Sequence, residues 1–167
     1  MDEQQKFNEI IKKVEALKKS GSIDLSNEED LSIAIMNLIS LEEHFYFTGE
    51  KTGKKEYFNV LNEIRSIRKE LLSRLIDKHE GETWCITKHL LATTMRLIEV
   101  GTKFQSDGEK KEASEMFDRA YKIYSIFWAL RLKLVDLAGV KKIAADENGK
   151  PWTLQNIVDK LVDCCDE

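Results

Sequence analysis

Residues 84–134 read WCITKHLLATTMRLIEVGTKFQSDGEKKEASEMFDRAYKIYSIFWALRLKL, and this stretch decides the fold. Its apolar residues recur every three or four positions on both sides of Ser106-Asp107-Gly108, which is the spacing of amphipathic helices. Ser, Asp and Gly are residues that tight turns favour. The stretch therefore predicts two long helices, at about 84–105 and from 109 to about 137, folded back on each other as a hairpin.

Small and aromatic residues stand at defined offsets within this hairpin. They are Leu97, Val100, Gly101, Phe104, Gly108, Ala113, Phe117 and Ala120. This spacing resembles a tetratricopeptide repeat over residues 94–127. Small residues at Gly101, Ala113 and Ala120 predict a close approach of the two helices, with Phe104 and Phe117 filling the space beside them. No copy recurs a repeat length away, so the resemblance implies a single hairpin rather than a superhelical array.

The segments on either side also have helical periodicity. Residues 27–47 and 55–78 predict two further helices, separated by a glycine-containing turn at 48–53. Four long helices joined by short loops are typical of an antiparallel up-down-up-down bundle. We therefore predict an all-α fold in one domain, residues 1–167. Its parts are an N-terminal helix at 1–20, a four-helix core at 27–137, a loop at 139–152 and a short C-terminal helix at 153–165.

Composition restricts the location and the partners of the chain. The 167 residues carry a net charge of −4 and no clustered basic face, so a nucleic-acid partner is not expected. Nothing after Met1 resembles a signal peptide, and no apolar run reaches the roughly 18 residues that span a bilayer. Cys85, Cys164 and Cys165 are an odd number with two adjacent, which favours reduced thiols. We expect a cytoplasmic protein that does not associate with membranes.

Charged residues fall in the middle of apolar helix faces. Glu42, Arg68 and Arg131 do so, and Tyr124 shares the face of Arg131. One interpretation is a structural buried ion pair between Glu42 and Arg68, because buried charges are usually paired. Its extra hydrogen bonds would come from Tyr124, Thr87 and Thr94. A second interpretation is a ligand-binding pocket in which Arg68 and Arg131 hold the carboxylate or phosphate of a small molecule. A third is that these charges reach the solvent along the bundle surface.

Signatures of catalysis and of metal binding are mostly missing. A ferritin-like di-iron bundle needs Glu-x-x-His on two helices, and no histidine is preceded by Glu at that offset. Cys85 and His89 lie one turn apart on a polar arc, which is too few ligands for a zinc site. We therefore expect no metal and no cofactor. Residues 74–79, from Arg74 to His79, resemble the Arg-x4-His pattern of HEPN ribonucleases, in which a dimer's Arg and His act on the RNA phosphate.

These observations favour a non-enzymatic helical scaffold that binds another protein or itself. The tetratricopeptide-like hairpin, the amphipathic terminal segments and the aromatic residues all suit that role. The aromatic run Phe45-Tyr46-Phe47 covers more than one helix face, so at least one ring should point outward or toward the N-terminal helix. The alternatives are a bundle that binds a small anion or a metal ion, and a HEPN-like ribonuclease.

Overall fold

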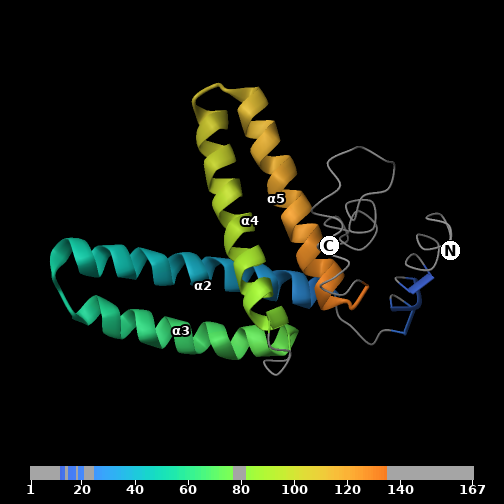
Figure 1. Ribbon diagram of the computed structural model, residues 1–167, viewed down its shortest axis with the longest axis horizontal. Helices are drawn as coiled ribbons and strands as arrows, with labels where there is room; N and C mark the ends of the chain where they lie inside the picture. Colours follow the sequence, from blue (N-terminus) through green and yellow to red (C-terminus); the bar gives the residue numbers. More distant parts are fainter. Residues whose placement is uncertain (1–11, 14, 18, 21–24, 77–81, 135–167) are drawn as a thin grey trace.

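The computed structural model describes residues 12–13, 15–17, 19–20, 25–76 and 82–134. Across these residues the chain forms long helices joined by short turns (Figure 1). The predicted all-α fold is confirmed. The helices are α2, Leu25–Thr52; α3, Glu56–Leu75; α4, Glu82–Ser106; and α5, Lys110–Arg131. The described residues before 21 are also helical, whereas the predicted loop at 139–152 and helix at 153–165 lie outside the described residues.

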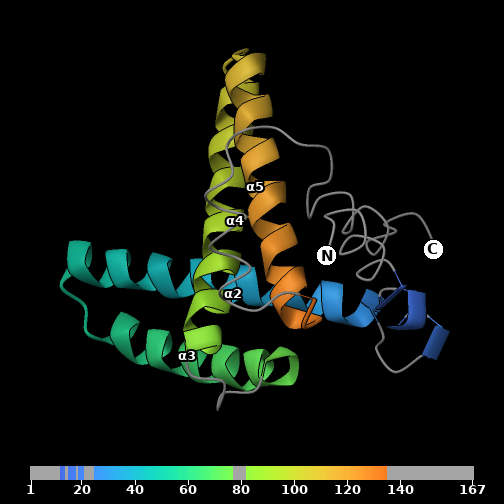
Figure 2. The ribbon, with the colours of Figure 1, turned by 45° about the vertical axis from the view of Figure 1, so that its right-hand side comes forward.

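The helices pair as two antiparallel hairpins, α2 with α3 and α4 with α5 (Figure 1). The predicted alternation in direction holds within each hairpin. The hairpins themselves cross, so that α4 and α5 run across α2 and α3 rather than alongside them, as Figure 2 also shows. The main contact between the two hairpins is the one between α2 and α4. The far end of each hairpin therefore projects as an arm away from the crossing.

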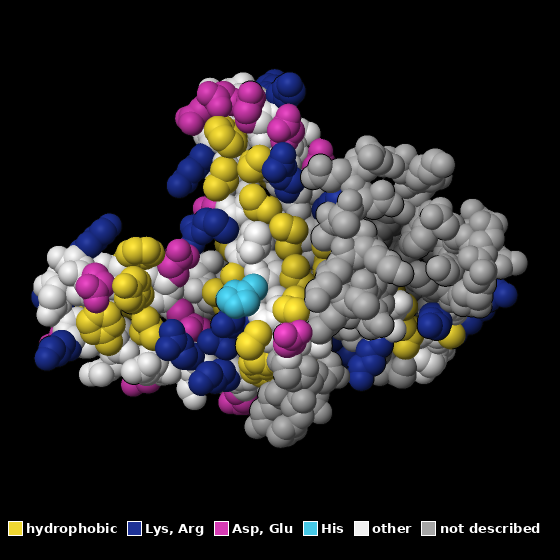
Figure 3. All heavy atoms as spheres, in the orientation of Figure 1, with side chains coloured by type: hydrophobic (Ala, Val, Ile, Leu, Met, Phe, Trp, Pro, Cys, Tyr) yellow, Lys and Arg dark blue, Asp and Glu magenta, His cyan; other side chains and the backbone are white. Residues whose placement is uncertain are grey.

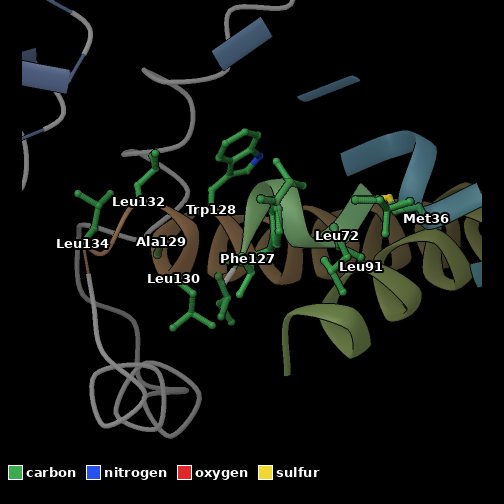
Figure 4. Packing of buried hydrophobic residues seen from close by; sticks show 13 residues of the cluster. Met36, Leu72, Leu91, Phe127, Trp128, Ala129, Leu130, Leu132 and Leu134 are labelled. Carbon is green, nitrogen blue, oxygen red and sulfur yellow. The ribbon is translucent and has the colours of Figure 1, made fainter. Parts of the chain in front are cut away.

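The core lies where the hairpins cross. It combines the first half of α2, the last turn of α3, the first half of α4 and the end of α5. Six consecutive residues of α5, from Ser125 to Leu130, are buried, because neighbouring elements surround this part of the helix. Phe127 and Trp128 are its largest fully buried side chains, with rings 5.3 Å apart at 67° (Figure 4). Edge-to-face aromatic pairs of this kind add about 0.5–1.5 kcal/mol to the stabilisation from burial. Leu17 of the N-terminal segment also packs against this core.

Two glycines allow close contact between paired helices. A Cβ atom on Gly101 would lie 2.6 Å from Cε1 of Phe117, so α4 and α5 approach as closely as the spacing of small residues predicted. Ala113 and Ala120 are buried on the facing side of α5. A Cβ atom on Gly49 would lie 2.8 Å from the Phe58 ring. The turn predicted at 48–53 lies further along the chain: α2 continues through Gly49 to Thr52, and residues 53–55 turn the chain, with Gly53 at φ +66°.

The end of α5 also differs from the predicted helix to 137. The helix stops at Arg131, and the next residues form a Schellman motif: the Leu134 amide donates to the Ala129 carbonyl and the Lys133 amide to the Leu130 carbonyl. This motif places Lys133 at φ 54°, in the left-handed region. Glycine usually occupies such a position, so the sequence carried no signal for this helix end.

None of the four helices that the structure describes has the length and apolar character needed to cross a membrane.

Candidate functional site

A buried ion pair joins the two helices of the first hairpin. The Glu42 carboxylate on α2 accepts hydrogen bonds from Arg68 on α3, with Nε at 2.7 Å from Oε1 and a terminal guanidinium nitrogen at 3.3 Å from Oε2. Glu42 is 8% exposed and Arg68 is 5% exposed. The predicted pairing of these residues inside the fold is confirmed. Because both oxygens and two guanidinium nitrogens take part, the pair has the bidentate geometry that arginine favours.

Arg65 completes this site, and the sequence reasoning missed it. Its Nε donates to Oε2 of Glu42 at 2.9 Å, while about half of its side chain remains exposed. Arg65 stands three residues before Arg68 and therefore on the same side of α3, which is the signal that could have identified it. The residues predicted to supply the extra hydrogen bonds do not do so. The Thr94 hydroxyl donates to the Leu90 carbonyl, and the Thr87 hydroxyl has no partner among the described residues.

The environment of Glu42 keeps its side chain ionised. Burial alone would raise the pKa of the carboxyl group, but the hydrogen bonds and positive charges of Arg68 and Arg65 outweigh burial. The pKa of Glu42 therefore lies below its ordinary value of 4.5. A carboxylate held between two guanidinium groups is already neutralised, which suits a structural role better than an exchange of protons.

The other two predicted site residues belong to a second polar cluster, between the start of α2 and the end of α5. Arg131 pairs with Glu28 at 2.5 Å, and the Tyr124 and Ser32 hydroxyls share a hydrogen bond of 2.7 Å. Buried atoms of this cluster that have no partner among the described residues are Glu28 Oε2, Arg131 Nε and Trp128 Nε1.

The predicted site residues therefore form two clusters rather than one. Glu28 and Glu42 are separated by about 20 Å along α2, at about 1.5 Å per residue. Arg68 and Arg131 each pair with a different one of these glutamates. A single small anion held by both arginines is inconsistent with this separation.

A groove of about 430 Å³ lies in the angle between α2 and α4. An ion pair between Glu43 and Arg96 connects the two helices there. Phe47, which is 50% exposed, and Met95 supply its large apolar side chains. The remaining lining residues are Ser40, His44, Thr48, Lys51 and Glu99. Figure 3 views the face on which the two arms meet, with hydrophobic side chains on both arms and charged ones between them.

One side chain of this groove was predicted from the sequence. The run Phe45-Tyr46-Phe47 predicted that one ring would face outward, and both Tyr46 and Phe47 do. Phe45 instead stacks on Tyr57 of α3, with ring centroids 6.2 Å apart. The contribution of α4 could not be anticipated, because the periodicity of a helix does not specify which other helix crosses it.

Groups suited to catalysis are scattered in the part of the chain that the structure describes. No cluster of three or more metal-ligating side chains occurs there. Cys85 is an exposed free thiol. Arg74 is exposed and pairs with Glu70, while its proposed ribonuclease counterpart, His79, lies outside the described residues. No protein family model, curated protein or solved structure matches the chain.

Proposed function

We propose that this chain is a non-enzymatic helical module of the cytosol that binds another protein in the groove between α2 and α4. The observation that carries the proposal is the half-exposed Phe47 ring beside Met95 in a concave angle between two projecting arms. Aromatic, Met and Arg side chains are enriched where proteins bind each other. Leaving a Phe side chain half exposed costs hydrophobic free energy that a bound partner would recover.

The lining of the groove suits a peptide or helix better than an enclosed metabolite. Its charged residues carry both signs, with Lys51 and Arg96 against Glu43 and Glu99. Such a mixed rim around an apolar centre resembles the anatomy of a protein interface. The ligand we infer is a helical segment whose apolar side chain rests on Phe47 and Met95 and whose flanking charges have both signs.

The α4–α5 hairpin supports the same function. Its spacing resembles tetratricopeptide repeats, which bind peptides on helical surfaces, and its Gly101–Phe117 contact is the kind of packing that this spacing implies. The anion-binding alternative has less support, because the Arg68 guanidinium is already occupied by Glu42. A ligand would have to displace a buried carboxylate to bind there.

Matched variants test the proposal. Phe47→Glu places a charge in the groove, whereas Ile67→Glu alters a side chain of similar exposure (48%) that lies on α3, outside the groove. Proteins cross-linked to the intact chain in a native lysate would be identified, purified and titrated calorimetrically against each variant. We expect Phe47→Glu to weaken binding at least tenfold and Ile67→Glu to leave it unchanged. Equal binding by both variants would refute the groove as the binding site.

A further inference from the structure

The α2–α3 hairpin has a second apolar face, on the side turned away from α4. Glu43 marks the side of α2 that meets α4, through its ion pair with Arg96. Leu41 lies two residues earlier, which is about 200° around the helix and so on the opposite side. Among the described helices, α3 packs extensively against α2 only. No described helix therefore packs extensively against this opposite face.

A heptad stripe runs along α2 on this face. Ala34, Leu38, Leu41 and Phe45 are spaced by four, three and four residues, which is the spacing of helices that pack side by side. Ala34 is exposed and the other three are half-buried. The apolar side chains are thus only partly covered by the partner helix α3.

A second heptad stripe runs along α3. It has the same spacing and consists of Val60, Ile64, Ile67 and Leu71, of which Val60 is 36% and Ile67 is 48% exposed. Arg68 and Glu42 are residues through which α3 and α2 contact each other. Ile67 directly precedes Arg68, and Leu41 directly precedes Glu42. Positions that precede the contact positions of two antiparallel helices lie on the same side of the pair, as in antiparallel coiled coils. The two stripes therefore form one continuous apolar face.

The outer edges of the hairpin carry complementary groups at the same seven-residue interval. On α3 the edge carries Glu56, Glu63 and Glu70, of which Glu70 also pairs with Arg74. On α2 the edge is basic or uncharged and consists of Lys51, His44 and Asn37. The contacts of Glu42 with Arg65 and of Gly49 with Phe58 set the hairpin register. In that register Lys51 stands level with Glu56, His44 with Glu63 and Asn37 with Glu70, but on opposite edges of the hairpin.

We propose that a second copy of this chain docks on this face and forms a four-helix interface between two α2–α3 hairpins. A two-fold axis parallel to the helices would place α2 over the α3 helix of the other copy. The Lys51 edge of each copy would then lie along the Glu56 edge of the other. A two-fold axis perpendicular to the helices would instead set one acidic edge against another, so the charge pattern selects the parallel axis.

The geometry suits a reversible dimer. The 20 residues of α3 span about 30 Å, and two adjacent helices are about 20 Å wide, which gives a footprint on the order of 600 Å² per chain. Two such footprints total roughly 1,200 Å², at the lower limit for stable interfaces. The α4–α5 hairpin lies on the other side of α2. His44 and Lys51 of the groove lining also belong to the edge that meets the other copy, whereas Phe47 and Met95 do not.

The mass of the full chain in solution tests this dimer. Light scattering after size-exclusion should give twice the 19.3 kDa chain mass for the wild type and for Phe47→Glu, but a single chain mass for Ile67→Glu with unchanged helix content. A monomeric wild type at about 100 μM, or a dimer that survives Ile67→Glu, would overturn the proposal. If Ile67→Cys in a monomeric chain resisted alkylation, another segment such as residues 153–162 would occupy the face instead.

Charge reversal tests the orientation. One variant carries Glu56→Lys and Glu63→Lys, and a second carries His44→Glu and Lys51→Glu. Each alone sets like charges together and should be monomeric, whereas their mixture restores complementary edges on both sides and should form a heterodimer. Failure of the mixture to associate, or unimpaired dimers of either variant alone, would exclude the parallel axis.

Discussion

At the scale of single residues, substitutions of Glu42 and Arg68 test whether their buried ion pair adds to the stability of this fold. Arg68→Met would leave the Glu42 carboxylate buried with only the half-exposed Arg65 as partner. We expect a loss of about 3 kcal/mol in the free energy of unfolding, since breaking a buried pair costs about 3–5 kcal/mol. Glu42→Leu combined with Arg68→Met should recover most of it, because apolar replacements of a whole pair are often neutral. Urea denaturation measures the free energy of unfolding of the single and the double variant. An unchanged stability of Arg68→Met alone would contradict the predicted cost of breaking the pair.

The lowered pKa of Glu42 adds a second prediction at this scale. Because the pKa is lower in the folded than in the unfolded chain, ionised Glu42 stabilises the fold above pH 4.5. That stabilisation is lost as the pH falls through the folded-state pKa. The stability difference between the wild type and Glu42→Gln should therefore be largest near pH 7 and smaller at about pH 3. Chemical denaturation at both pH values measures it, and a difference that grows at low pH would contradict the assignment.

At the scale of the helices, the spacing of Gly101 and Phe117 carries the contact between α4 and α5. Gly101→Ala would gain about 1 kcal/mol of helix propensity, but its Cβ atom would overlap the Phe117 ring and approach Met116 Cβ to 3.2 Å. We expect a net loss of about 1–2 kcal/mol. Adding Phe117→Ala should remove the overlap, so the two substitutions should couple in a double-mutant cycle. Additive effects on the free energy of unfolding would indicate that the ring simply moves aside.

The helices also show what could be read from the sequence. Glu42 and Arg68 could be paired because both interrupt apolar stripes, and the α4–α5 contact could be found because small residues stand at regular offsets. Glu28, the partner of Arg131, could not be identified from the sequence, because an acidic residue in the first turn of a helix is ordinary. Gly49 resembled a turn residue and is in fact a contact residue within α2. Periodicity identifies apolar faces, but it leaves open which helix each face meets and at what angle.

At the scale of the whole molecule, the crossing of the hairpins concentrates stability in one place. The core at the crossing joins both hairpins, while each arm beyond it is held by a single helix–helix contact. Amide hydrogens of residues 32–36, 87–94 and 125–130 should therefore exchange most slowly, and those next to the turns at Gly53 and Gly108 most rapidly.

Substitution within this core should affect both hairpins at once. Phe127 is fully buried, and Phe127→Ala should cost about 3–5 kcal/mol through lost burial and the cavity that remains. Because Phe127 belongs to the same core cluster as Ile35 of α2 and Leu72 of α3, the loss of protection should extend over the first hairpin as well as the second. Hydrogen exchange followed by mass spectrometry distinguishes the outcomes. A loss confined to α4 and α5 would mean that the hairpins unfold independently, and the angle between α2 and α4 would then be too loosely held to form a lasting binding groove.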